Sequence, residues 1–183
     1  CTRLTTPPTQ VRRPTPRRIV ATRTSIHDVI DKFRAEPSST ERGTRFEKLM
    51  KSYFETDPTL ASEYDQVKTW QEWKHNERTH DSGIDLVARN KHTGRWTAIQ
   101  CKFYDSGHYL QKKDIDSFFT ASGKAWDQIW FDNRIIISTT DRWSSQAERA
   151  LEHQSLPVQR IGLAEIAESP IDWMFTPEKL SYE

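Results

Sequence analysis

The sequence predicts one domain of the mixed α/β class, and three observations support that prediction. Apolar residues recur at helical spacing over 26–33 and again over 46–54. Shorter apolar runs separated by a turn follow over 83–104, which is typical of two neighbouring strands. The run "NRIIIST" at 133–139 then indicates a buried strand between two helical segments. The predicted order is α, β, β, β, α, β, α, β, with a central mixed β-sheet flanked by helices.

Two helices are expected to begin the domain. Ser25 can cap the first, over 26–36, and Asp28 lies in its first turn. The second helix, over 38–56, is expected to end near Pro58, because proline disrupts a continuing helix. Its apolar stripe consists of Phe46, Leu49, Met50, Tyr53 and Phe54.

The strands of the sheet follow these helices. A first strand is expected over 63–73, where apolar and polar residues alternate imperfectly. Two more lie in 83–104 and turn at "RNKHTGR", whose asparagine and glycine favour a turn. The remaining expected elements are a helix over 110–126, the strand at 133–139, a helix over 141–154, and a short strand and helix within 156–169.

The two ends of the chain differ from the expected domain at 25–175. Residues 1–24 hold six arginines, four prolines and no acid, and the prolines exclude a continuous helix there. This segment is expected to be an extended basic arm or linker, and its charge would also suit contact with a nucleic-acid backbone. Residues 176–183 are expected to begin a linker to a downstream domain.

Composition narrows the class of protein. The net charge of +1 argues neither for nor against nucleic acid. No apolar run reaches the roughly 18 residues of a membrane span, and no signal peptide is visible. Cys1 and Cys101 cannot build a disulfide framework, so a reducing, cytoplasmic location is expected. Packing is expected for Trp126 and Trp130, and docking against a neighbouring domain for Trp143 and Trp173.

Three polar residues interrupt the two strands at 83–104. Gln100 and Lys102 share one face of their strand, because side chains alternate across a strand. If the two strands pair antiparallel, Asp85 meets these two residues near one end of the sheet. Such groups are costly to bury unless they are paired or bind a metal.

Ordinary explanations exist for each of these residues. Asp85 and Lys102 alone are most simply an ion pair with Gln100 hydrogen-bonded beside it, since paired charges are common at strand ends. Upstream, Glu47 lies at the margin of the helical apolar stripe and can face the sheet, or it can be an exposed acid paired with Lys51. The two-part pattern "GID" and "QCK", together with this acid, favours a functional site.

The segments "RFEKLMKSYF", "GIDLVA" and "IQCKFY", in this order and spacing, resemble the PD-(D/E)XK nucleases over roughly residues 40–140. The glutamine in place of the usual second acid resembles the Mrr-like branch found in restriction endonucleases. The resemblance implies a restriction-endonuclease-like α-β-β-β-α-β core, which matches the predicted order. The chain is also similar to the N-terminal nuclease domain of Type ISP enzymes, single-polypeptide and ATP-dependent, in which helicase-like and methyltransferase domains follow.

The resemblance further implies a role for each site residue. Asp85 is the central metal ligand, Gln100 stands where a second carboxylate usually stands, and the backbone carbonyl of Cys101 is a further ligand. Glu47 supports the metal site, directly or through water. Lys102 is the catalytic lysine, which orients or deprotonates the attacking water or stabilises transition-state charge. Hard oxygen ligands suit Mg²⁺, with Mn²⁺ as a substitute, although a neutral glutamine binds a cation more weakly than glutamate does.

A phosphodiester of double-stranded DNA is therefore the expected substrate, and the chain is expected to be the nuclease module of a restriction or phage-defence enzyme. A modification-dependent Mrr-type nuclease and a catalytically silent DNA-binding or docking module remain as alternatives. A zinc site built from His75, His80 and Asp81 is a rival metal site, but a solvated loop fits this polar stretch better.

Overall fold

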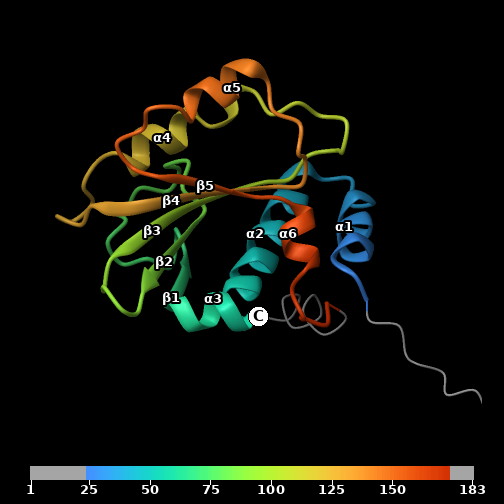
Figure 1. The fold of residues 1–183 in the computed structure, drawn as a ribbon, viewed down its shortest axis with the longest axis horizontal. Helices are drawn as coiled ribbons and strands as arrows, with labels where there is room; N and C mark the ends of the chain where they lie inside the picture. Colours follow the sequence, from blue (N-terminus) through green and yellow to red (C-terminus); the bar gives the residue numbers. More distant parts are fainter. Residues whose placement is uncertain (1–23, 174–183) are drawn as a thin grey trace, which may run out of the picture.

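The computed structural model describes residues 24–173, which fold around a single sheet of five strands (Figure 1). The strand order is β1–β2–β3–β4–β5; the β1–β2 and β2–β3 pairs are antiparallel, and β4 runs parallel to both β3 and β5. The predicted mixed sheet is confirmed. The strands are β1 (Tyr64–Thr69), β2 (Leu86–Asn90), β3 (Trp96–Lys102), β4 (Phe131–Ser138) and β5 (Val158–Ile161).

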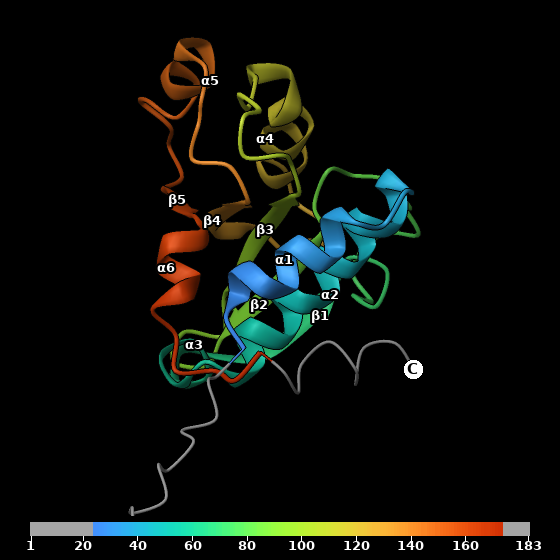
Figure 2. The same ribbon diagram turned by 90° about the vertical axis from the view of Figure 1, so that its right-hand side faces the viewer.

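Helices cover both faces of this sheet (Figures 1 and 2). Two of them, α4 and α5, lie over one face, and α1, α2 and α6 lie over the other. The predicted linker at 176–183 and nearly all of the predicted arm at 1–24 lie outside the described residues. The helices are α1 (Ile26–Arg34), α2 (Ser39–Thr56), α3 (Pro58–Glu63), α4 (Asp116–Ser122), α5 (Ser145–Ala150) and α6 (Leu163–Ala167), with a short 3₁₀ turn, η1 (Lys112–Asp114).

Helix starts follow local capping chemistry. Ser25 caps α1 as predicted: its hydroxyl accepts from Asp28 N at 3.2 Å, and the Asp28 carboxylate accepts from Ser25 N at 3.1 Å. The second predicted helix, α2, ends at Thr56, close to Pro58 as expected, and Pro58 then begins α3. The Asp57 carboxylate accepts from the next two free backbone N–H groups at 3.0 Å each, and a proline in the first helical position loses no hydrogen bond.

Three predicted elements are shorter than expected. The helix expected over 110–126 is reduced to η1 and α4, and the helix over 141–154 to α5, which begins only where Ser144 caps it. The strand expected over 63–73 ends at Thr69, and the chain then turns. Trp70 and Trp73 of this turn are buried against the sheet, so tertiary packing overrides the alternating pattern.

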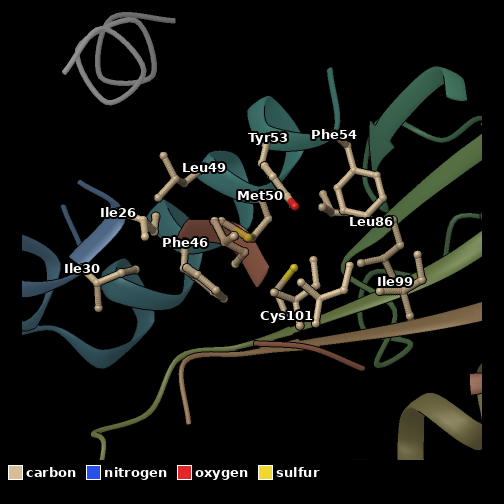
Figure 3. Packing of buried hydrophobic residues seen from close by; sticks show 14 of the residues in the cluster. Ile26, Ile30, Phe46, Leu49, Met50, Tyr53, Phe54, Leu86, Ile99 and Cys101 are labelled. Carbon is tan, nitrogen blue, oxygen red and sulfur yellow. The ribbon is translucent and has the colours of Figure 1, made fainter. Parts of the chain in front are cut away.

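The core lies in two layers, one on each face of the sheet. The layer beneath α1, α2 and α6 contains Phe46, Met50 and Cys101, which Figure 3 shows between α2 and the strands. The other layer, beneath α4, is rich in tryptophan. Because β3 is central in the sheet and has a core on both faces, six of its seven residues are buried, including the polar Gln100.

The tryptophans differ in part from expectation. Trp126 is buried as predicted, but Trp130 is 66 % exposed, so the prediction that it packs is wrong. Trp173 is only 2 % exposed and lies 6.0 Å from the Tyr53 ring, ring centre to ring centre. It therefore belongs to the core of this domain instead of docking elsewhere. In the described part of the chain, no helix has the length and apolar character needed to cross a membrane.

Candidate active site

The candidate site lies at the end of the sheet where β3 finishes and β2 begins. Asp85 directly precedes β2, yet its backbone N–H donates to Ile99 O at 3.0 Å and its carbonyl accepts from Trp70 N at 2.9 Å. Both backbone groups of Asp85 are thus bonded to neighbouring chain segments. In the β2–β3 register Leu86 pairs with Ile99, and the Asp85 N–H bonds this same Ile99, so the regular pairing ends at Leu86 and Asp85 lies against the last residues of β3.

The Asp85 carboxylate is held by the backbone of the neighbouring strand. Its Oδ2 accepts from Cys101 N at 2.7 Å. Glu47 lies close to it, half-buried on α2 between the buried Phe46 and Met50, and burial together with the charge of Asp85 raises the pKa of Glu47. The structure therefore brings together two acids that are 38 positions apart in the sequence, from a helix and from a strand end.

Lys102 is the last residue of β3 and is half-buried. Its charge lowers the pKa of both Glu47 and Asp85, so its ammonium lies within electrostatic reach of both. Among the described residues, however, Lys102 makes no ion pair within 4.0 Å. The simple Asp85–Lys102 ion pair, which was the ordinary alternative, does not form.

Both acids are difficult to ionise in this environment. Burial raises the pKa of Asp85 from 3.8 to about 6, against the opposing effects of the Cys101 N–H and of Lys102. Burial, followed by the neighbouring Asp85, raises the pKa of Glu47 from 4.5 to about 7. Near neutral pH the protein alone therefore does not compensate two negative charges here, and a proton or a cation has to supply the balance.

Gln100 has a definite orientation within the core. The side chain is 2 % exposed, and its Nε2 donates to the carbonyl oxygen of Gly83 at 3.1 Å. Its Oε1 is buried and receives no hydrogen bond from the described residues. A buried acceptor without a donor costs roughly 1–3 kcal/mol, and a bound cation would satisfy it.

The donor set therefore fits a hard divalent cation. Two carboxylates, one amide oxygen without a donor and a backbone carbonyl are oxygen ligands of the kind that Mg²⁺ prefers. The described residues hold no group of three His, Cys, Asp or Glu side chains placed to bind a metal, so Gln100 is the candidate for a third side-chain ligand. The Cys101 thiol lies in the core with Met50 (Figure 3), and burial raises its pKa, so the thiol is poorly suited to bind a metal as a thiolate.

The residues of the rival zinc site have other partners. His75 Nδ1 lies 2.6 Å from Asp127 Oδ2, and His80 Nδ1 lies 3.4 Å from Gln71 Oε1. Asp81 is instead close enough to Asp85 for its charge to raise the Asp85 pKa. Of the three, only Asp81 belongs to the neighbourhood of the site.

Gly83 is the site residue that sequence reasoning missed. The sequence shows a glycine two positions before Asp85, and nothing in the pattern reveals that its carbonyl receives a hydrogen bond from Gln100. Its φ of +83° is a signal that only the folded backbone provides.

Comparison with known proteins identifies the family. The Mrr_cat_2 restriction endonuclease family matches residues 55–181. The chain belongs to this restriction endonuclease family. Its predicted place among Mrr-like PD-(D/E)XK nucleases is thereby confirmed, and so is the restriction-endonuclease-like fold. Asp85, Gln100 and Lys102 lie inside the matched range, and Glu47 lies upstream of it.

Three solved structures are similar to the chain to different degrees. The ATP-dependent Type ISP restriction-modification enzyme LlaBIII, solved bound to DNA, is 30 % identical with a TM-score of 0.66; the match covers 83 % of this chain and 9 % of that enzyme. The modification-dependent restriction endonuclease AspBHI is 14 % identical with a TM-score of 0.48, over 77 % of this chain and 33 % of its own. The restriction endonuclease MspJI, in complex with an oligonucleotide, is 14 % identical with a TM-score of 0.47, over 76 % and 29 %. No curated protein matches the chain.

Proposed function

We propose that this nuclease domain hydrolyses phosphodiester bonds of double-stranded DNA with a divalent metal, Mg²⁺ or in its place Mn²⁺. Glu47, Asp85, Gln100 and the backbone carbonyl of Cys101 would hold the ion. When bound, the ion neutralises phosphate charge and activates water for attack. The observation that carries the proposal is the close pair of Asp85 and Glu47, whose carboxyl groups are hard to ionise because they are buried. The Gln100 oxygen, which is buried without a donor, supports it.

Each side chain has a distinct task in this proposal. Asp85 is fixed by the Cys101 N–H, so its second oxygen is held in one direction. Glu47 lies close to Asp85, and burial raises its pKa to about 7, so it can hold a proton at its carboxyl group near neutral pH. Lys102 is free of ion pairs within 4.0 Å among the described residues, so its ammonium is available to orient the attacking water or to stabilise charge on the phosphate oxygens.

The test compares Asp85→Ala with Asp65→Ala, in which an exposed carboxylate that pairs with Arg89 is removed. The proposal expects Asp85→Ala to lose cleavage of duplex DNA in Mg²⁺ and to lose binding of Mn²⁺ in a calorimetric titration, while Asp65→Ala keeps both. If Asp85→Ala still cuts at the parent rate, the assignment of the site is wrong.

The wider context of the domain is also part of the proposal. The match spans less than a tenth of the Type ISP enzyme, so any activity of a whole enzyme goes beyond what this chain carries. The 30 % identity and the TM-score of 0.66 support a module that works in one polypeptide with helicase-like and methyltransferase domains and receives its DNA from them. A modification-dependent restriction enzyme would use the same catalytic residues. The complete set of Glu47, Asp85, Gln100 and Lys102 argues against a catalytically silent module.

A further inference from the structure

Gly83 lies in the loop before Asp85, and its backbone packs directly against the first turn of α4. Its φ is +83°, a conformation that side chains rarely adopt. A Cβ added here would lie 2.6 Å from Ser117 Oγ and 2.9 Å from Phe118 N, in the first turn of α4. Any larger residue would therefore displace either the helix or the loop, and with the loop the Gly83 carbonyl.

That carbonyl determines which group can occupy position 100. It accepts from Gln100 Nε2 at 3.1 Å, so the amide nitrogen faces Gly83 and the amide oxygen faces another direction. An amide has one donor side and one acceptor side, whereas an ionised carboxylate has only acceptors. Glutamate in the same orientation would place a charged oxygen against the Gly83 oxygen, inside a site that is 2 % exposed at this residue.

We propose that Gly83 is a positioning residue of the site, whose carbonyl holds the Gln100 amide with its oxygen free for the cation and makes position 100 specific for glutamine over glutamate. The inference rests on the proposed metal site. The surroundings of Gln100 then match an amide, and a carboxylate at this position, as related nucleases carry, would not be the better ligand here. Adding a negative charge at this position is expected to disturb the site instead of strengthening it.

The first experiment uses Gln100→Glu, with Gln159→Glu on the exposed part of β5 as the matched control. Urea unfolding is measured in EDTA at pH 8, for the single variants and for Gly83→Ala combined with Gln100→Glu. An ionised carboxylate at position 100 cannot donate to the Gly83 carbonyl as the amide does. At pH 8 we expect Gln100→Glu to lower the folding equilibrium constant at least about tenfold, and to lower it less when Gly83→Ala is also present, because the effects of two groups in contact are coupled. The control is expected to follow the parent.

The second experiment measures Mn²⁺ binding by calorimetry. A third carboxylate alone would tighten Mn²⁺ binding, but we expect Gln100→Glu at pH 8 to bind no more tightly than the parent. Gly83→Ala is compared with Gly94→Ala, whose φ of +70° imposes similar strain but whose Cβ would have nothing within 4 Å. We expect Gly83→Ala to lose at least tenfold in Mn²⁺ affinity and Gly94→Ala to keep the parent affinity.

The outcomes separate this inference from the proposed function. If Gln100→Glu is as stable as the parent at pH 8 and binds Mn²⁺ more tightly, the Gly83 carbonyl imposes no preference and the inference is refuted. Should Gly83→Ala fail to fold, the stability and the Mn²⁺ affinity of Gln100→Glu at pH 8 still decide. If the parent binds no Mn²⁺ but Gln100→Glu is less stable than the parent at pH 8, the Gly83 contact stands and the metal-dependent function is what fails.

Discussion

The replacement Asp85→Asn tests whether the charge of Asp85 destabilises the metal-free fold. Asparagine has nearly the same volume as aspartate, so the packing is kept. Its amide oxygen can accept from the Cys101 N–H in place of the carboxylate oxygen, which accepts at 2.7 Å. The replacement removes a carboxylate, and burial raises the pKa of this carboxylate from 3.8 to about 6. The variant isolates the cost of ionising this group.

The magnitude and its sign follow from proton linkage. A rise from 3.8 to about 6 is about two pH units, which corresponds to at most ~3 kcal/mol. Because Asp85 and Glu47 titrate as an interacting pair, we expect on the order of 2 kcal/mol for Asp85 alone. The folded-state pKa is the higher one. The stabilisation from protonation is therefore complete below pH ~4 and is lost as the pH rises through about 6.

The assay is thermal and urea unfolding in EDTA from pH 4 to pH 8. At pH 8 Asp85→Asn is expected to be more stable than the parent by ~2 kcal/mol, which is about 4–8 °C in Tm for a domain of this size. Near pH 4 the two are expected to unfold alike. Mg²⁺ or Mn²⁺ should stabilise the parent, by about 2.7 kcal/mol at one hundred times Kd, and leave the variant unchanged.

Asp65→Asn provides the control of opposite sign. The hydrogen bond from Arg89 lowers the pKa of Asp65, so losing this charge should destabilise the protein at pH 8. A parent that is more stable than Asp85→Asn at pH 8 without metal would refute the reasoning. It would mean that Lys102 and the Cys101 N–H more than compensate the buried charge.

Three further predictions follow from the described contacts and from the arginines of the basic arm. Lys102→Ala should keep Mn²⁺ binding in calorimetry while DNA cleavage falls by ~10²–10³, because it removes a cation but no oxygen ligand; lost binding in a folded variant would contradict this role. Trp173→Ala should cost about 3–5 kcal/mol in urea unfolding, whereas Trp130→Ala, at 66 % exposed, should change stability by less than about 0.5 kcal/mol; equal effects would contradict the assigned packing. Deleting residues 1–24 removes six arginines and should weaken DNA binding and flatten its dependence on salt, as measured in a salt series; an unchanged slope would mean that the arm contacts no phosphate.

Local sequence patterns were sufficient where neighbouring residues determine the structure. The capping box of Ser25 and Asp28 and the apolar stripe of α2 involve residues at most a few turns apart, and both are present as predicted. The alternation along β3 likewise predicted that Gln100 and Lys102 lie on one face. Predictions failed where distant residues decide. The turn after Thr69 places Trp70 and Trp73 over the sheet, and Trp173 returns from the end of the domain to pack on Tyr53.

The sequence by itself determined the mixed α/β class, the family and the residues that were candidates for chemistry, because each of these depends on residue types and on their spacing along the chain. Only the tertiary structure decided how those residues meet. It brought Glu47 close to Asp85, kept Lys102 from pairing with Asp85, and turned the Gln100 amide toward Gly83. The physical reason is that the cost of burying a polar group depends on the donors and acceptors that surround it in space, and those come from elements far apart in the chain.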